Sequence, residues 1–522
     1  MHTHKLIIIG LDGATWKVIN PLVKENNLEN LKNITNRGSY GILSSCYPPV
    51  TGPAWLSMAT GKNPGKIGIF DFISIDKDYS KSHIVNSNDF IKNHPYWDLL
   101  NNADYETIIS HHPMLYPLYD LKGIMTAGIG SPNDSEIVKP KIHENKINNI
   151  TQGYWARIDW HSSKYYNKNL FIEDLTTLIE KQFNSVDYLL NEKWDLFLHI
   201  CSATDFLQHV MWKDWKKKDS TFYKEFVNIW KLIDENIGKI YDRHRDSNLF
   251  IVSDHGFGSL NYNFNLNKML IDIDYLKRKR FFHLKKIIFD FYLKIFKIFK
   301  NTKVGKKIKI IIKDNNIGKK SLNIGLPVSP EIDIIKSKVL PGFSSGLHGT
   351  ILIKDENEKR EIKKEIKKEF LKIEKRYKIS IDVFEPTDLY IGDKIDLAPD
   401  ILFSINNFNT SVQYSKIEEE LFSEFKAEKN KTGTHRTEGI LIATGPDIKE
   451  NFNIKASIYD IFPTILHMFN VSIPRDIDGK VLKEIFKEDS ELSNKDIVYK
   501  KKFSEKELLK FKINNLKSSG KI

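Results

Sequence analysis

The chain has 522 residues, of which 41% are hydrophobic and 28% are charged. This composition is that of a globular protein with a large core, and it excludes a disordered chain. The formal net charge of +12 favours anionic partners, which include phosphorylated substrates, acidic lipid headgroups and nucleic acid.

Cysteine usage and the lengths of the apolar runs bear on where the protein works. The two cysteines, Cys46 and Cys201, are too few for a disulfide framework or a thiolate metal site. No apolar run reaches the roughly 18 to 20 residues of a membrane span. Residues 5–9 read as a strand rather than as part of a signal peptide. We therefore expect a reduced, cytoplasmic location.

Short apolar runs recur along the chain, and each lies near a polar motif. They are residues 6–9 before Asp12, 194–200 before Asp205, 248–252 before Asp254, and 439–443 after His435. Runs of this kind are typical of strands buried on both faces of a parallel sheet. Helical patterns at 170–191 and 222–243 complete an α/β alternation. The sequence therefore predicts a doubly wound, mostly parallel sheet sandwiched by helices, with ligands bound beyond the carboxyl ends of its strands.

Thr51 has the surroundings of a nucleophile. It lies between Pro49 and Pro53, just before a helix-compatible run at 54–60. Its hydroxyl would lie beside free backbone N–H groups, which also hold anions. A divalent cation can lower the pKa of such a hydroxyl enough for attack on phosphorus. Taken alone, the same pattern is that of an ordinary N-cap threonine.

Asp205 and His209 have the spacing of metal ligands. They are four residues apart, so a helix places the carboxylate and the imidazole on one face. Asp254 and His255 are adjacent at a strand end, where Gly256 permits a sharp turn.

Asp12 and His435 add one carboxylate and one imidazole. Asp12 ends the first strand and His435 lies in a turn. Each of these motifs alone has an ordinary structural explanation. Together they supply enough oxygen and nitrogen ligands for two divalent cations.

In this order the motifs resemble the alkaline phosphatase superfamily, specifically its type I phosphodiesterase/nucleotide pyrophosphatase family. The resemblance spans residues 5–485 and adds matching stretches at 60–65, 68–72, 95–98, 398–401, 459–466 and 473–479. It implies an alkaline phosphatase-like fold and a small phosphorylated substrate.

The resemblance also implies two metal ions, usually zinc, although the ligand types are compatible with manganese too. The ligands of one would be Asp12, Thr51, Asp254 and His255, and those of the other Asp205, His209 and His435. Thr51 would attack phosphorus and form a phosphothreonine, which water would then hydrolyse.

Residues 1–485 would form the catalytic domain, with insertions at about 75–170 and 260–345, and residues 486–522 a lysine-rich tail. Within the second insertion, 275–313 is basic and rich in Phe and Ile. We expect it to pack as an amphipathic helical insert or to contact an anionic membrane peripherally, whereas nucleic acid is disfavoured. The Lys/Glu run at 354–377 predicts a solvated helix with i,i+4 pairs.

Some positions depart from the family pattern. Nucleotide pyrophosphatases carry asparagine three positions after the nucleophile, where this chain has Ala54. This weakens the case for nucleotide substrates. Sulfatases carry arginine four positions after their nucleophile, where this chain has Trp55. Lys62 and Arg436 are the cationic side chains that could approach a bound phosphate.

The leading hypothesis is a metal-dependent hydrolase of phosphodiester or pyrophosphate bonds that acts through Thr51. The first alternative is a phosphomonoesterase, phosphotransferase or phosphomutase on the same two-metal scaffold. The second is a non-catalytic anion- or membrane-binding protein. No motif encodes the leaving group or the oligomeric state.

Overall fold

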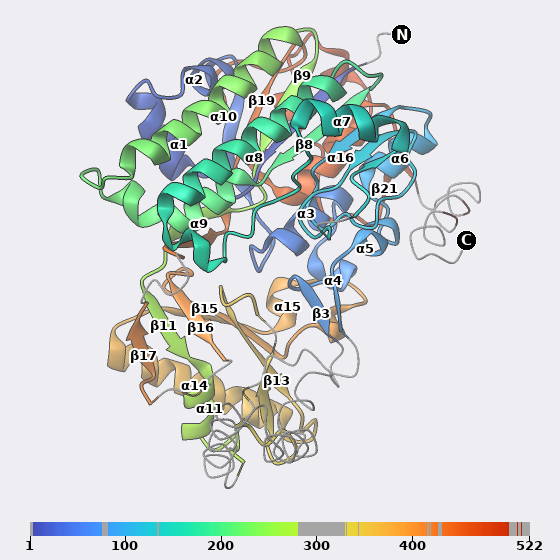
Figure 1. Ribbon diagram of the computed structural model, residues 1–522. Coiled ribbons are helices and arrows are strands. Elements are labelled where there is room, and N and C mark those ends of the chain that lie inside the picture. The colour runs from blue at the N-terminus through green and yellow to red at the C-terminus, as the bar shows by residue number, and fades with distance from the viewer. Residues whose placement is uncertain are drawn as a thin grey trace, which may run out of the picture.

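A computed structural model of the chain describes residues 4–75, 82–132, 135–279, 329, 331–342, 344–414, 417, 419–425, 431–500, 509 and 513. These residues form two lobes (Figure 1). The larger lobe is built on a nine-stranded sheet, and the smaller lobe on a four-stranded and a three-stranded sheet.

The nine-stranded sheet is mostly parallel. Its strand order is β20 (Phe452–Ser457), β2 (Gly38–Ser44), β19 (Glu438–Thr444), β9 (Asn248–Val252), β1 (Leu6–Leu11), β8 (Leu196–Cys201), β5 (Thr107–Ser110), β6 (Gly123–Thr126) and β7 (Val138–Lys139). From β9 to β6 every neighbouring pair is parallel. β19 and β7 run antiparallel to their neighbours.

The side chains of β1 alternate between two separate cores. Leu6 and Ile8 belong to one hydrophobic cluster, and Ile7 and Ile9 belong to the other. A strand that is buried on both faces needs an unbroken apolar run, which is what residues 6–9 supply. The predicted doubly wound, mostly parallel α/β fold is confirmed.

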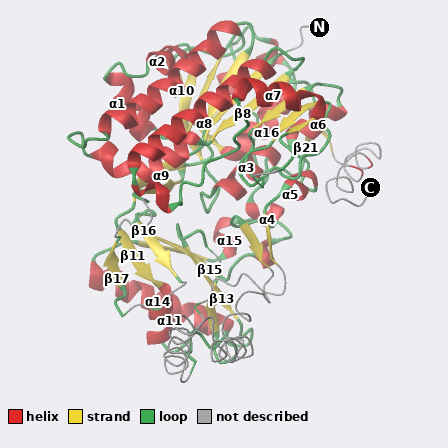
Figure 2. Ribbon diagram, viewed as in Figure 1, coloured by secondary structure: helices red, strands yellow, loops and turns green. Residues whose placement is uncertain are grey.

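Helices cover both faces of the sheet (Figures 1 and 2). Those on one face are α1 (Trp16–Lys24), α2 (Glu29–Asn36), α7 (Glu144–Thr151), α8 (Lys168–Leu189), α9 (Ala203–Lys216) and α10 (Tyr223–Arg243). Those on the other are α3 (Thr51–Thr60), α4 (Pro64–Ile67), α5 (Ser87–Ile91), α6 (Tyr96–Asn102) and α16 (Ile461–Met468). The helices predicted at 170–191 and 222–243 are α8 and α10.

The smaller lobe has its own core, which includes Phe264, Phe370 and Phe403. Its four-stranded sheet contains β12 (Val339–Pro341), β13 (Gly349–Ile353), β15 (Ile401–Ile405) and β14 (Ile381–Phe384). Its three-stranded sheet contains β16 (Thr410–Gln413), β11 (Tyr262–Asn265) and β17 (Phe422–Glu424). Its helices are α11 (Leu266–Asp272), α14 (Lys359–Tyr377) and α15 (Pro386–Leu389).

α14 is the helix predicted for the Lys/Glu run at 354–377. It is solvated on one side only, because Ile362, Ile366, Phe370 and Ile373 are buried at spacings of four, four and three residues. Its Lys–Glu ion pairs within the helix are spaced i,i+3 rather than i,i+4.

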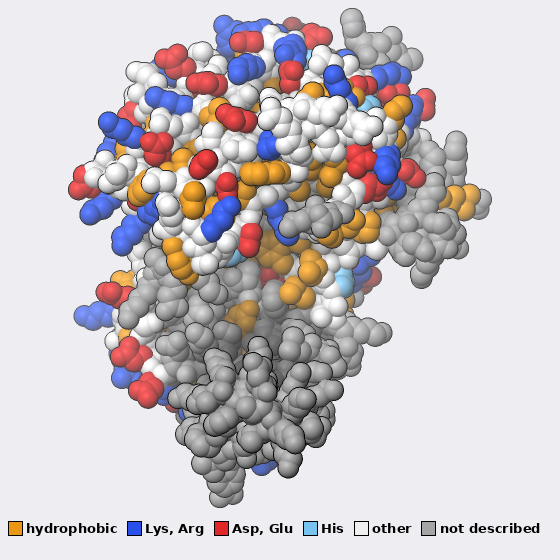
Figure 3. All heavy atoms as spheres, in the orientation of Figure 1, with side chains coloured by type: hydrophobic (Ala, Val, Ile, Leu, Met, Phe, Trp, Pro, Cys, Tyr) orange, Lys and Arg blue, Asp and Glu red, His pale blue; other side chains and the backbone are white. Residues whose placement is uncertain are grey.

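Of the basic segment 275–313, residues 280–313 lie outside the described residues, so its membrane contact stays a prediction. Residues 486–500 of the tail pack on the larger lobe, where Phe486 and Leu492 are fully buried. No helix within the described ranges is long and apolar enough to cross a bilayer. On the face shown in Figure 3, acidic and basic side chains of the larger lobe are interspersed.

Candidate active site

The sequence motifs meet at the carboxyl edge of the central sheet. Asp12 follows β1 directly, Asp254 and His255 follow β9, and α9 begins two residues after β8 ends. Because these strands are parallel neighbours, their carboxyl ends share one edge. The Gly13 backbone N–H donates to Asp254 Oδ1 at 3.2 Å. Figure 1 places α3 and α9 on the side of the larger lobe that faces the smaller lobe.

Thr51 is the first residue of α3, a helix that is buried along its whole length. The helix begins at Thr51 rather than after it, because Pro53 is compatible with a first helical turn. The residue before it, Val50, has extended backbone geometry. The Thr51 Oγ1 lies 3.5 Å from His255 Nε2. The hydroxyl therefore faces the Asp254–His255 motif, beside the N-terminal end of a helix.

Trp55 joins the helix that carries Thr51 to the first motif. Its indole Nε1–H donates to Asp12 Oδ2 at 3.3 Å. A Cβ atom at Gly10 would lie 2.6 Å from the Trp55 ring. Glycine at position 10 is therefore what lets the indole reach Asp12.

Asp12, Asp254 and His255 form the first cluster of ligand-type side chains. His255 Nε2 lies 3.4 Å from Asp12 Oδ1 and 3.4 Å from Asp254 Oδ2. His255 Nδ1 donates to the Gly256 carbonyl at 3.1 Å. A protonated Nδ1 leaves Nε2 with a free lone pair, which is the tautomer that a metal ligand needs.

Asp205, His209 and His435 form the second cluster. Asp205 Oδ1 lies 3.4 Å from His209 Nε2 and 3.3 Å from His435 Nε2. Their Nδ1 atoms face carbonyls at 2.9 Å, that of Gly433 for His209 and that of Pro49 for His435. Both Nε2 atoms are thus acceptors, yet they lie 3.0 Å apart. Two lone pairs at this distance favour a shared cation.

The two clusters are continuous with each other. The rings of His255 and His435 stack with centroids 3.7 Å apart and planes at 15°. Asp205, His255 and His435 also offer ligand atoms within 4.8 Å of one another. His255 therefore lies between the two clusters.

Three carboxylate oxygens in these clusters are buried without a hydrogen-bond partner in the described part of the chain, namely Asp12 Oδ1, Asp205 Oδ1 and Asp254 Oδ2. Burial raises the pKa of Asp12 and of Asp254 well above the ordinary value and raises the pKa of Asp205 to about 8. Buried unpartnered carboxylates are costly. Divalent cations would satisfy all three oxygens, so the residues present fit a metal centre.

Burial acts on the imidazoles in the opposite direction. It lowers the pKa of His209 and of His255 well below the ordinary value and lowers the pKa of His435 to about 3. All three rings are therefore neutral near pH 7, as metal ligands must be.

Comparisons with known proteins decide the family. The model of the type I phosphodiesterase / nucleotide pyrophosphatase family matches residues 6–307, which is more than half of the 522 residues. The chain belongs to this family. It is a hydrolase of that class, and the family depends on metal ions. Six of the seven predicted site residues lie within the matched range, whereas His435 lies beyond it.

Solved structures resemble the fold. Murine ectonucleotide pyrophosphatase/phosphodiesterase 5 is 12% identical, with a TM-score of 0.50, over 93% of this chain and all of that one. The same values hold for its inactive variant in complex with AMP. At this identity the likeness concerns the fold alone. No curated protein matches the sequence.

Two residues at the site of this phosphodiesterase-family protein carry no sequence signal. The Trp160 ring lies on the His209 ring, with centroids 4.5 Å apart and planes at 12°. Lys431 carries a cation near the second cluster. Burial lowers its pKa to about 8, and the charge of Asp205 opposes that shift. Lys431 lies two residues before Gly433, a position that no motif singles out.

Arg436 and Lys62 do not act as phosphate-facing cations. Arg436 donates to the carbonyls of Phe408, Thr434, His435 and Ser259 at 2.7 to 3.3 Å. Lys62 Nζ lies 2.6 Å from Asp476 Oδ2. The expectation that these two side chains approach the phosphate is corrected, because both are committed to other partners.

Replacing Arg436 by methionine is expected to lower the free energy of unfolding by about 2 to 3 kcal/mol, because four carbonyls lose a charged donor. Urea unfolding measures this change. The matched control is Arg37→Met at an exposed helix end, where we expect a change within about 0.5 kcal/mol. Equal effects of the two substitutions would contradict the structural role of Arg436.

Proposed function

We propose that the protein hydrolyses phosphodiester or pyrophosphate bonds and that Thr51 is its nucleophile. The observation that carries this proposal is the Thr51 hydroxyl at 3.5 Å from His255 Nε2. The hydroxyl thus faces the buried residues through which the two ligand clusters meet. A threonine in this position has a carboxylate and imidazole environment that an ordinary N-cap residue does not need.

The reaction divides into two displacements at phosphorus. Thr51 Oγ1 first forms a bond to phosphorus while the ester oxygen on the far side leaves with its bonding electrons. The hydroxyl proton is lost from Oγ1, and the departing oxygen takes up a proton. The phosphorus on Oγ1 still carries the second substituent of the substrate. Water then forms a bond to phosphorus while the bond to Oγ1 breaks, a proton returns to Oγ1, and the phosphorylated product leaves with that substituent.

We propose that two divalent cations serve this site. Zinc is the preferred ion, and manganese also suits the ligands. The residues that would hold one are Asp12, Thr51, Asp254 and His255. Those that would hold the other are Asp205, His209 and His435. When bound, such ions lower the pKa of the nucleophile and neutralise phosphoryl charge.

The substrate is proposed to be a small phosphorylated molecule. The inactive variant of the murine ectonucleotide pyrophosphatase/phosphodiesterase 5 was solved with AMP, which supports this class. Ala54 occupies the position where nucleotide pyrophosphatases carry asparagine, so a nucleotide is not required.

A phosphomonoesterase is the second candidate function, and Lys431 favours it. A monoester carries one more negative charge than a diester, and a cation beside Asp205 would attract that charge. The two functions therefore make opposite predictions for substrate preference.

Side-by-side hydrolysis of bis(p-nitrophenyl) phosphate and p-nitrophenyl phosphate tests the proposal. We expect a higher kcat/KM for the diester in the presence of zinc or manganese, and loss of activity with EDTA. Preference for the monoester would replace the diesterase by the monoesterase. Turnover that persists with EDTA would refute metal dependence.

A further inference from the structure

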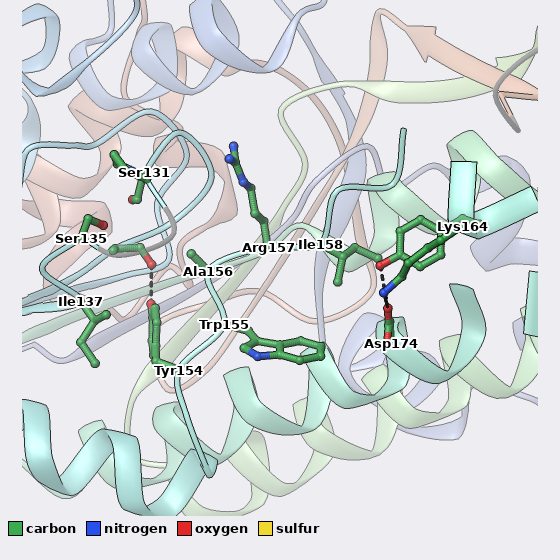
Figure 4. A pocket seen from close by; sticks show the side chains of 13 residues that line it. Ser131, Ser135, Ile137, Tyr154, Trp155, Ala156, Arg157, Ile158, Lys164 and Asp174 are labelled. Carbon is green, nitrogen blue, oxygen red and sulfur yellow. Dashed lines mark hydrogen bonds and ion pairs between the residues drawn. The ribbon is translucent and has the colours of Figure 1, made fainter. Parts of the chain in front are cut away.

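A cavity of about 350 Å³ lies in the larger lobe, and Ile158, two residues before Trp160, is part of its lining. Its walls come from the loop after β6, from residues 154–158, from Lys164 and Tyr165, and from Asp174 of α8. Figure 4 shows Trp155 and Arg157 extending from the middle segment, with Ser131 and Ser135 on one side and Lys164 and Asp174 on the other.

The cavity lies at the same edge of the sheet as the ligand clusters. Ala127 lines it and directly follows β6, which runs parallel to β5, β8 and β1. Ile158 also lines it, two residues before Trp160, whose ring lies 4.5 Å from the His209 ring. A chain extends at most about 3.6 Å per residue, so the Cα atoms of Arg157 and Trp160 lie within about 11 Å. A three-residue segment thus joins the cavity wall to the residue that stacks on His209.

Among the described residues that line the cavity, one of the two cationic side chains has an ion-pair partner and the other has none. Lys164 Nζ lies 2.5 Å from Asp174 Oδ2, and the Tyr165 hydroxyl donates to the same carboxylate at 2.7 Å. Arg157, by contrast, forms no ion pair or hydrogen bond with the rest of the described chain. Its planar guanidinium presents several donors that match a carboxylate or a phosphate.

The remaining wall suits a flat organic group. Trp155 contributes an indole, one side of which is covered by Lys181 Nζ at 5.4 Å from the ring centroid. The Ser131 hydroxyl donates to the Gly128 carbonyl at 2.8 Å, and the Tyr154 hydroxyl donates to the Ala127 carbonyl. These bonds fix the wall in place, so the cavity is formed before a ligand enters.

We propose that this cavity binds an anionic group, a carboxylate or a further phosphate, on one ester substituent of the substrate, and that Arg157 is its ligand. The inference rests on the proposed function, because it assigns the cavity to the substrate of that site. Arg157 is a specificity-determining residue here and takes no part in the chemistry.

Three matched diesters test the proposal. Each has p-nitrophenyl as one substituent, and the other is a phenyl with a para carboxylate, a para phosphonomethyl group or a neutral para carboxamide. Both released phenols are quantified with the zinc-loaded protein. We expect kcat/KM to be about tenfold higher for an anionic diester than for the carboxamide. This is the change expected when one hydrogen bond to a charged group forms at a partly exposed site. A gain for the phosphonomethyl diester alone would identify a further phosphate as the natural group.

Substitutions assign the preference to one side chain. Arg157→Gln is expected to bring the ratio of the anionic to the neutral diester close to one, and Arg157→Lys to restore part of it. The matched control is the double substitution Lys164→Gln/Asp174→Asn, which removes this ion pair without changing the net charge of the wall and should therefore keep the wild-type ratio. An unchanged ratio in Arg157→Gln, or no anion preference in the wild-type protein, would overturn the proposal.

Equilibrium binding separates this inference from the proposed function. The affinities of the three diesters are measured by calorimetry on Thr51→Ala protein, with and without Arg157→Gln, so that no turnover is needed. Tighter binding of an anionic diester that disappears with Arg157→Gln supports the cavity even if the wild-type protein hydrolyses none of them. Equal affinities for all three would refute it even if hydrolysis is rapid.

Discussion

Replacing Thr51 by alanine is expected to lower kcat for diester hydrolysis by at least about a thousandfold, because the reaction loses its nucleophile. The substitution should leave the fold intact. Thr51 is buried, but alanine is a good helix former and fits the same space, so we expect the free energy of unfolding to change by less than about 1 kcal/mol. Steady-state rates and urea unfolding on the same preparation measure both quantities.

Thr51→Ser is the matched variant for this experiment. Serine keeps a hydroxyl at the same position, so part of the activity should remain, and acid-quenched protein should carry on residue 51 the phosphoryl group with its remaining ester substituent. Full activity in Thr51→Ala would assign the nucleophile to another group, such as water. Loss of activity together with a large loss of stability would instead show that Thr51 acts through the structure of α3.

The fold could be predicted because its signals are local. An unbroken apolar run such as 6–9 is readable without knowledge of any partner strand, and it indicates burial on both faces. The smaller lobe was harder to foresee. Its strands β13 and β15 pair although about fifty residues separate them, and α14 lies between them in the chain. The sequence interpretation assigned only part of this region, 260–345, to an insertion.

The sequence also predicts some residues of the candidate site and not others. Asp205 and His209 are recognisable by their spacing, and Asp254 and His255 by their place after a strand. Trp160 and Lys431 could not be found in this way, since their approach to His209 and Asp205 depends on how distant loops fold. Arg436 looked like a phosphate ligand because of its neighbour His435. The antiparallel pairing of β10 (Gly256–Ser259) with β18 (Gly433–Arg436) instead directs its guanidinium to backbone carbonyls.

Metal-free protein is expected to lose stability as the pH rises from about 6.5 to 8. Burial raises the pKa of Asp12 and of Asp254 well above the ordinary value, and raises that of Asp205 to about 8. In this window the folded chain therefore holds protons that the unfolded chain has released. Each such carboxyl group contributes a slope of up to about 1.4 kcal/mol per pH unit.

The histidines of the site do not offset this loss. Their pKa values are lowered by burial, so the stability linked to them increases only up to the ordinary imidazole value near 6.5. Asp71 and Asp98, whose pKa values burial raises to about 7, lie outside the clusters. Their deprotonation should therefore still lower the free energy of unfolding as the pH rises in the zinc-bound protein, but less steeply than in the metal-free protein.

Zinc is expected to raise the stability and to flatten this pH dependence, since the cation takes the place of the protons on the carboxylates. At a zinc concentration a thousandfold above Kd, one site contributes about 4 kcal/mol. Calorimetric titration at pH 7 in two buffers of different ionisation enthalpy should show protons released on binding, and fewer of them in Asp254→Asn. Metal-free stability that is constant between pH 6.5 and 8, or zinc binding without proton release, would contradict the assignment of these buried carboxylates as the metal ligands.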